Sequence, residues 1–311
     1  MKNNFADKLI EAVGLKGNAV CVGLDPRLDK IPEFLKDRCW SSEKNPLEVA
    51  GEMLLEFNKG IIDAVADLVP AVKLQAAFYE IYGSFGMKAY AESIQYAKSR
   101  GLLTIADVKR GDIGSTAEAY ADAYLGEAVM FEGDEEEFVV PGFDADAITI
   151  NPYMGWDSVK PFVEKAGLHG KGVFILVKTS NATSGDIQDL KMDDGRTVAE
   201  IVAGYVDSWG ADMVGESGYS SVGAVVGATY PDEAAALRKL MPEAVFLVPG
   251  YGAQGATAQD VKSSFNADGL GAIVNNSRGI IHAYERYEDL GAKLYDEAAR
   301  RAVEEMIKDL K

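Results

Sequence analysis

Eight short apolar runs recur along this chain, with longer stretches between them. The runs are continuous rather than alternating in polarity, which is typical of parallel strands that are covered on both faces. They cover residues 19–23, 71–74, 102–106, 147–150, 173–177, 222–226, 245–248 and 270–274. Few folds accommodate so many buried strands in one chain.

Helical spacing of apolar residues fills most of the intervals between these runs. The clearest examples are residues 47–68, 87–100, 198–208, 232–240 and 290–308. Eight strand-then-helix units predict an α/β protein of the (β/α)8 class, a TIM barrel, with residues 1–311 as one domain. The alternative is an open doubly wound sheet. Its dinucleotide-binding form loses support because Leu24-Asp25-Pro26-Arg27, not a Gly-x-Gly-x-x-Gly motif, follows the first run.

Three polar stretches account for the length beyond a minimal barrel: residues 27–45, 126–143 and 181–196. We interpret them as surface insertions. The second contains an acidic run at 132–137, which is expected to be a solvated loop because it lacks the residue spacing of a calcium loop.

Charge and composition narrow the classes of ligand. Lysine and arginine total 31 and aspartate and glutamate total 49, so the formal net charge is −18. This field repels nucleic acid and anionic membranes, so any anionic ligand must be captured by a few local cations. The sequence predicts a soluble cytoplasmic protein for three reasons. It contains only two cysteines, it shows no signal-peptide pattern near the N-terminus, and it has no apolar run long enough for a membrane span.

The third run leads into the densest set of charged residues. Asp107 and Lys109 are two residues apart, so strand alternation predicts that both point into the barrel mouth as a buried acid and amine. Asp112 follows just beyond the strand. Lys73 occupies the same height on the second strand, where a lysine needs a carboxylate partner. These four residues form a candidate catalytic array, although a structural ion pair between strands is the simpler alternative.

The last two strands predict a phosphate site. A glycine-rich stretch, 248–255, follows the seventh run, and Arg278 follows the eighth. Glycine-rich backbone before a helix, with a nearby arginine, is the usual phosphate site of such barrels. His169 and His282 fall away from the strand ends and are expected to be structural or surface residues.

These motifs resemble the orotidine 5'-phosphate decarboxylase family, in particular its longer bacterial branch, type 2. The resemblance runs from about Phe5 to Ala283. The Asp-x-Lys-x-x-Asp element is shared with related sugar-phosphate barrels, and Lys73 with the phosphate loop makes the match specific. The matching segments are Gly23-Leu24-Asp25-Pro26, Glu56-Phe57-Asn58, Val72-Lys73, Asp107 to Ile113, Lys178-Thr179-Ser180-Asn181 and Pro249 to Gly255.

The resemblance implies a carboxy-lyase of pyrimidine biosynthesis that converts orotidine monophosphate to UMP and CO2 without metal or cofactor. Lys109 would stabilise and protonate the ring carbanion, Asp107 would lie beside the substrate carboxylate, and Lys73 would hold Asp107. Asp112 would come from the partner chain of a homodimer with shared active sites. The resemblance also implies substrate-binding roles for Asp25 and Thr116 at the ribose, Ser180 at the pyrimidine, and Gln254 and Arg278 at the phosphate.

Three other functions stay open on the residues alone. A magnesium-dependent sugar-phosphate decarboxylase or synthase of the same superfamily shares the third-strand motif, but it has an acid where this chain has Lys73. A Schiff-base aldolase would use Lys109 as the nucleophile. A barrel that binds phosphate without catalysis is the third.

Overall fold

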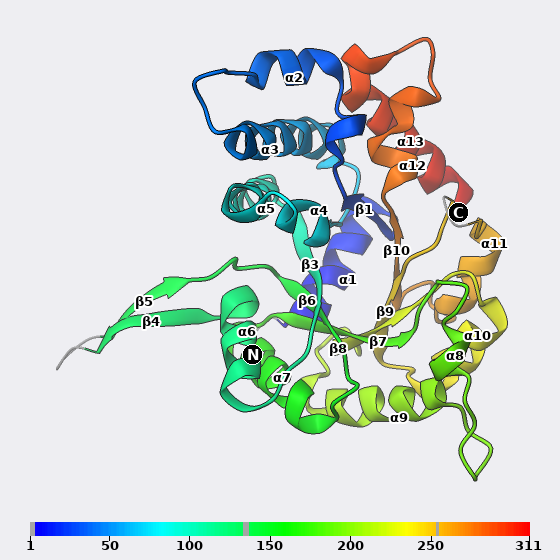
Figure 1. Ribbon diagram of the computed structural model, residues 1–311. Helices are drawn as coiled ribbons and strands as arrows, with labels where there is room; N and C mark the ends of the chain where they lie inside the picture. The colour runs from blue at the N-terminus through cyan, green and yellow to red at the C-terminus, as the bar shows by residue number, and fades with distance from the viewer. Residues whose placement is uncertain (1–3, 133–136, 253–254) are drawn as a thin grey trace. The chain divides into compact units, whose positions relative to one another are not determined.

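The computed structural model describes residues 4–132, 137–252 and 255–311. Eight strands of this part of the chain form a closed barrel in the order β1-β10-β9-β8-β7-β6-β3-β2 (Figure 1). Each corresponds to one predicted run, so the predicted TIM barrel is confirmed. The strands are β1 (Val20–Leu24), β2 (Ala71–Gln75), β3 (Leu103–Arg110), β6 (Ala147–Ile150), β7 (Gly172–Lys178), β8 (Ser220–Val226), β9 (Ala244–Val248) and β10 (Ala272–Asn276).

Polar residues extend several strands beyond the apolar runs that predicted them. β2 continues to Gln75, β3 to Arg110 and β10 to Asn276. These residues stand at the carboxyl ends of the strands, where a barrel of this class places its functional side chains. The apolar pattern therefore located the strands and stopped short of their polar carboxyl ends.

The five predicted helices are also present, with small shifts at their ends. The helix predicted over 290–308 begins at Tyr295, because Gly291 has a φ of +63° and a short 3-10 turn precedes the helix. The described helices are α1 (Phe5–Lys16), α2 (Glu33–Cys39), α3 (Pro46–Val65), α4 (Ala77–Glu80), α5 (Gly83–Ser99), α6 (Gly114–Leu125), α7 (Trp156–His169), α8 (Gly185–Gln188), α9 (Val198–Gly210), α10 (Pro231–Leu240), α11 (Ala258–Val261), α12 (Arg278–Ile281) and α13 (Tyr295–Asp309).

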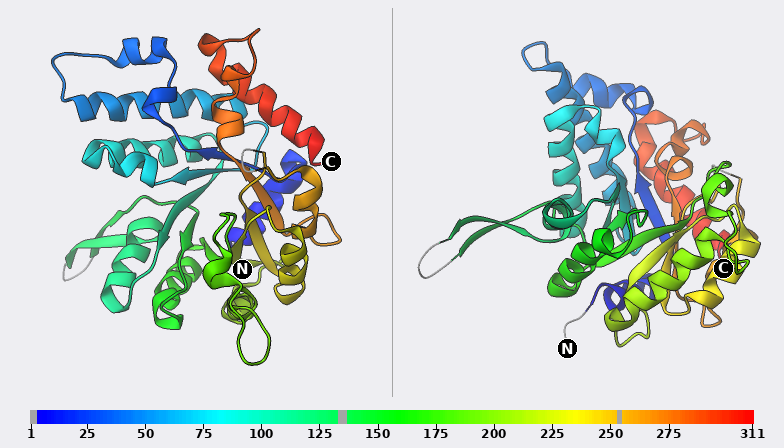
Figure 2. Two further views of the ribbon diagram at one scale, coloured as in Figure 1. Left: turned by 45° about the vertical axis from the view of Figure 1, so that its right-hand side comes forward. Right: turned by 60° about the horizontal axis from the view of Figure 1, so that its bottom comes forward.

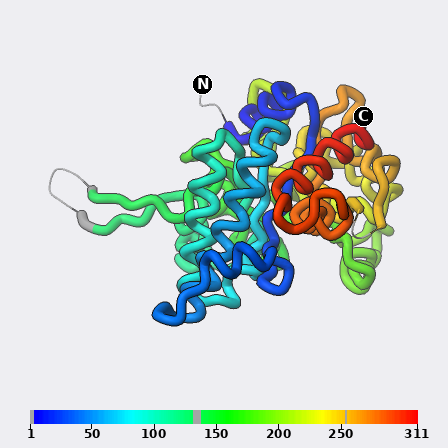
Figure 3. The backbone as a smooth tube through the Cα atoms, turned by 90° about the horizontal axis from the view of Figure 1, so that it is seen from above, coloured from blue at the N-terminus to red at the C-terminus, as the bar shows by residue number. Residues whose placement is uncertain are grey.

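Contacts divide the chain into two compact units. One consists of residues 13–108 and 275–311. Within it, parallel pairing sets Gly23 opposite Lys73 and Gln75 opposite Asp107. The long helices α3 and α5 lie side by side (Figures 1 and 3). α3 begins at Pro46, where Asn45 accepts a hydrogen bond from the Leu47 N–H, and it buries an apolar stripe that includes Phe57.

The other unit consists of residues 1–12 and 109–274. It contains an antiparallel hairpin of β4 (Glu127–Glu132) and β5 (Glu137–Pro141), which extends away from α6 (Figure 2). A loop was expected for the acidic run at 132–137, and that expectation is wrong for the two ends of the run, because Glu132 ends β4 and Glu137 begins β5. Across the hairpin Val129 pairs with Val139 and Ala128 pairs with Val140, and valine is a strand former. Residues 133–136 of the acidic run lie outside the described residues.

Arg238 of α10 is buried in the same unit. Its guanidinium donates to the main-chain carbonyls of Ser264, Met241, Ala244 and Gly271 at 2.7–3.1 Å. Its Cζ also lies 3.5 Å from the centroid of the Phe246 ring. This side chain therefore ties α10 to the ends of three neighbouring segments.

The remaining insertions contain short helices, α2 in residues 27–45 and α8 in residues 181–196. Across the ranges that the structure describes, every helix falls short of the length or apolar character needed to cross a membrane.

Candidate active site

A buried lysine on β2 lies between two carboxylates. Lys73 Nζ donates to Asp107 Oδ2 at 2.7 Å and lies 3.9 Å from Asp25 Oδ1. The Lys73 side chain is 5% exposed, and those of Asp25 and Asp107 are 16% and 10% exposed. The structure thus brings together three of the predicted site residues. Asp25 Oδ1 is buried and accepts no hydrogen bond from the described residues, so it can accept one from a ligand hydroxyl.

The charges of this cluster favour the ammonium form of Lys73. Burial lowers the pKa of Lys73, but the charges of Asp107 and Asp25 more than compensate and raise its pKa above the ordinary value. Burial raises the pKa of the Cys21 thiol on β1 to about 12. Lys73 is therefore a fixed ammonium, and Cys21 is a neutral thiol.

Gln75 joins the cluster, although we assigned it no role from the sequence. Its Nε2 donates to Asp107 Oδ2 at 3.0 Å. Its spacing from Lys73 could have indicated this contact, because residues two apart on a strand share a face.

Lys109 follows on β3, and the structure corrects our expectation for it. Its φ is +48°, in the left-handed region, so strand alternation does not carry from Asp107 to Lys109. Lys109 is exposed rather than buried, and the buried amine bonded to Asp107 is Lys73. The Lys109 N–H donates to Thr149 Oγ1 of β6 at 3.0 Å. A lysine held in this strained conformation is itself a sign of function.

Asp112 and Thr116 lie just beyond β3. Asp112 is partly exposed, and its Oδ1 accepts a hydrogen bond from the Ile113 N–H at 2.8 Å. Thr116 is exposed in the first turn of α6. Both residues therefore face solvent at least in part.

Ser180 lies in a loop after β7 that is held by neighbouring segments. Gln188 of α8 accepts from the Thr179 N–H at 3.0 Å and donates to Thr179 Oγ1 at 2.8 Å. Thr229 Oγ1 donates to the Ser180 carbonyl at 3.2 Å. A Cβ at Gly227 would come within 2.8 Å of Ser180 Cα, so only glycine permits this approach. Lys178, at the end of β7, is buried and pairs with Asp189.

The predicted phosphate end is described in part. Arg278 is exposed at the start of α12, and within the described residues it forms no ion pair. Close by in sequence, Asn275 donates to Ser277 Oγ at 3.3 Å, while its own Oδ1 is buried without a partner among the described residues. A Cβ at Gly23 would lie 1.8 Å from Ser277 Oγ, so glycine is needed there. Gln254 lies outside the described residues.

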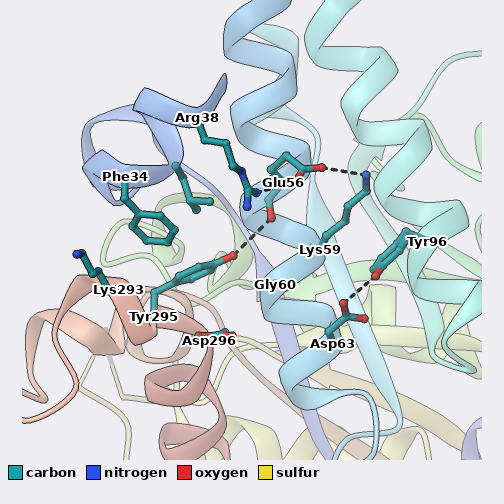
Figure 4. A pocket seen from close by; sticks show the side chains of 11 residues that line it. Phe34, Arg38, Glu56, Lys59, Gly60, Asp63, Tyr96, Lys293, Tyr295 and Asp296 are labelled. Carbon is teal, nitrogen blue, oxygen red and sulfur yellow. Dashed lines mark hydrogen bonds and ion pairs between the residues drawn. The ribbon is translucent and has the colours of Figure 1, made fainter. Parts of the chain in front are cut away.

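A separate cavity of about 510 Å³ lies among α2, α3, α5 and α13. Figure 4 shows Arg38 and Lys59 reaching Glu56, while Tyr295 points towards the same residue. None of the predicted site residues lines this cavity. Sequence reasoning gave no signal for it.

The cluster on β2 and β3 leaves little place for a divalent metal ion, because the Lys73 ammonium already lies between the two carboxylates. In addition, the described residues contain no group of three or more histidine, cysteine, aspartate or glutamate side chains that could hold a metal ion.

Comparisons with known proteins agree with one another. Residues 18–292 match the model of the orotidine 5'-phosphate decarboxylase / HUMPS family. The chain is 46% identical over 310 residues to the orotidine 5'-phosphate decarboxylase of Rhodopirellula baltica, covering 99% of each protein. It is 44% identical over 284 residues to that of Caldicellulosiruptor bescii, covering 91% of each.

The structural comparison has the same result. The structure of Leishmania donovani OMP decarboxylase aligns with a TM-score of 0.73 and 31% identity, over 99% of this chain and 97% of that one. Since the family model spans most of the chain and the relatives match it almost end to end, the chain belongs to the orotidine 5'-phosphate decarboxylase family.

Proposed function

We propose that this chain decarboxylates orotidine 5'-monophosphate to UMP and CO2, without metal or cofactor, as a carboxy-lyase of pyrimidine biosynthesis in the cytoplasm. The observation that carries the proposal is the buried Lys73 between Asp25 and Asp107, in a chain 46% identical to an orotidine 5'-phosphate decarboxylase over nearly its full length.

The reaction breaks the bond between the pyrimidine ring and its carboxylate. The electron pair stays on the ring carbon, CO2 leaves, and the carbon takes a proton. No neighbouring group of the ring delocalises that pair, so the required stabilisation lies near the top of the enzymatic range, about 20 kcal/mol or more. Fixed charges must supply much of it.

Each of the four charged residues has a role in this mechanism. The Lys109 ammonium stabilises the developing carbanion and donates the proton to it. Asp107 lies beside the substrate carboxylate and disfavours the charged ground state, while Lys73 holds Asp107 in position and neutralises it in part. Asp112 completes the array from the partner subunit of a homodimer.

The substrate's other groups need their own partners. The unpartnered Asp25 Oδ1 accepts hydrogen bonds from the ribose hydroxyls, with Thr116 assisting. Ser180 contacts the pyrimidine, and Gln254 and Arg278 bind the phosphate. Binding energy from this remote phosphate is available to organise the site around the reacting carbon.

The two catalytic alternatives fit these residues less well. A magnesium-dependent sugar-phosphate enzyme needs an open carboxylate site, whereas Lys73 occupies the space between Asp25 and Asp107. A Schiff-base aldolase needs a lysine activated by burial or by a neighbouring cation, whereas Lys109 is exposed.

The direct test mixes purified protein with orotidine monophosphate in the presence of a chelator and follows the loss of pyrimidine absorbance. We expect turnover that chelator does not affect and that borohydride does not trap. Lys109→Ala should abolish turnover while UMP binding stays within about tenfold, because Lys109 acts on charge that appears in the transition state. Equal losses of binding and turnover would contradict this role.

The shared active site has its own test, by the symmetry of a two-fold dimer. Lys109→Ala and Asp112→Ala chains should each be nearly inactive alone. A mixed dimer contains one site with both residues intact, so co-refolding equal amounts should restore about a quarter of all sites. If subunits exchange and the mixture stays inactive, Asp112 acts within its own chain.

A further inference from the structure

Asp107 accepts two hydrogen bonds on one oxygen from one neighbouring strand. Gln75 ends β2 opposite Asp107 in the parallel register. Its Nε2 lies 3.0 Å from Asp107 Oδ2, and Lys73 Nζ lies 2.7 Å from the same oxygen. The two donors are two residues apart and leave the same face of the strand. Together they fix the rotation of the carboxylate.

A main-chain hydrogen bond also joins the end of β2 to Asp107. The Ala76 N–H donates to the Asp107 carbonyl at 3.2 Å, and the chain then enters α4. The end of β2 is therefore joined to Asp107 through both main chain and side chain. This arrangement leaves the Gln75 amide little freedom relative to the carboxylate that it contacts.

Gln75 is also an uncharged donor. Lys73 contributes +1, and Asp25 and Asp107 contribute −1 each, so these three groups sum to 1 − 2 = −1. A lysine or arginine at position 75 would cancel this charge, and a glutamate would repel Asp107. An amide stabilises the carboxylate and leaves the net charge of the cluster unchanged.

We propose that Gln75 is a positioning residue for decarboxylation, which orients the Asp107 carboxylate and favours its ionised form without neutralising it. The inference rests on the proposed function, because that function gives Asp107 its place beside the substrate carboxylate.

The surroundings of Asp107 make the pH dependence of this role interpretable. Within this unit, the ionisable groups that act on Asp107 include Lys73 on β2 and Cys21 on β1, and Asp25 lies on the other side of Lys73. Lys73 and Cys21 keep their protonation states through the acid range. Gln75 donates to Asp107 alone in this cluster, so loss of the amide donor should move the acid limb of activity through Asp107, towards higher pH.

Wild-type turnover of orotidine monophosphate comes first, since its absence would overturn the proposed function and not the role of Gln75. Turnover is then measured for Gln75→Leu and Gln75→Glu from pH 4 to 9. Gln95→Leu, an exposed glutamine of α5 in the same unit, is the matched control.

For Gln75→Leu we expect kcat to fall about tenfold, as for the loss of one hydrogen bond to a charged group, with the Michaelis constant within about threefold. The acid limb of kcat should shift to higher pH. Gln75→Glu should lose about a hundredfold and shift further, because two carboxylates then compete for one proton. Gln95→Leu should match wild type.

A merely structural role predicts something else. If active wild type is established and both variants keep its kcat, or lose activity equally at every pH with an unmoved acid limb, Gln75 does not position Asp107. If Gln75→Leu fails to fold, the isosteric Gln75→Glu decides by the same criterion. A shift in melting temperature without a change in the pH profile also counts against the proposal.

Discussion

Lys73 and Arg238 are both buried cations, and they are held by opposite kinds of partner. Carboxylates surround Lys73, and they raise its pKa in spite of burial. Arg238 donates to main-chain carbonyls, and burial lowers its pKa to about 10. Carbonyls cannot ionise, so the Arg238 contacts can only hold segments together. Carboxylates respond to the charge of a ligand, so the Lys73 cluster can perform chemistry.

The largest effect on stability should come from Arg238→Met. It removes the hydrogen bonds that the guanidinium donates to four carbonyls, of which those of Gly271 and Met241 keep a main-chain donor. Such losses lower the free energy of unfolding by about 3–5 kcal/mol. Urea titration measures this change, and kcat per folded molecule should stay at the wild-type value. A loss under about 1 kcal/mol would break the comparison, because Arg238 would then not be a structural anchor.

Lys73→Met should have the opposite effects, a large loss of kcat and a smaller loss of stability. Removing the ammonium leaves Asp25 and Asp107 facing each other, so we expect kcat to fall about 10²- to 10³-fold, as for the loss of one preorganised charge. The free energy of unfolding should change less than in Arg238→Met, because carboxylates can take up a proton. Steady-state kinetics and urea titration on the same preparation measure both. Unchanged kcat would make Lys73 a structural ion pair.

A third buried group, His282, sharpens the comparison because both of its ring nitrogens lack partners among the described residues. Burial lowers its pKa in the fold. As the pH falls below the unfolded value of about 6.5, the unfolded chain takes up the proton first, so stability decreases by at most about 1.4 kcal/mol per pH unit.

His282→Phe should remove part of this loss and keep the stacking on Phe57. The measurement is the urea midpoint between pH 7.5 and 5, with His169→Gln as the control for losing a histidine elsewhere. If His282→Phe and wild type lose stability in parallel, His282 does not contribute.

The sequence predicted the barrel because buried parallel strands leave a strong and simple pattern, and each of the eight runs became a strand. It also predicted that Lys73 requires an acid, since an unpaired buried ammonium is too costly. The partner proved to be Asp107 on the next strand.

Other features had no such signal. The conformation of Lys109 depends on how β3 meets β6 through Thr149, which no spacing rule contains. The contact of Gln75 with Asp107 depends on register, and a shift of one residue would have turned the amide away. The hairpin of β4 and β5 was missed because the acidic run between its strands dominates the local composition. The predicted roles of the site residues stay predictions.

Because the backbone at Lys109 is left-handed, selection for stability and selection for turnover favour different residues at this position. Most residues with a Cβ are strained at a φ of +48°, whereas glycine adopts it without cost and asparagine at a reduced cost. Selection for heat resistance alone would favour replacing this lysine, while selection for turnover would retain it. Directed evolution that screens only for thermostability would therefore drift towards a well-folded barrel without the lysine that we propose as its proton donor, and such drift would be visible at position 109.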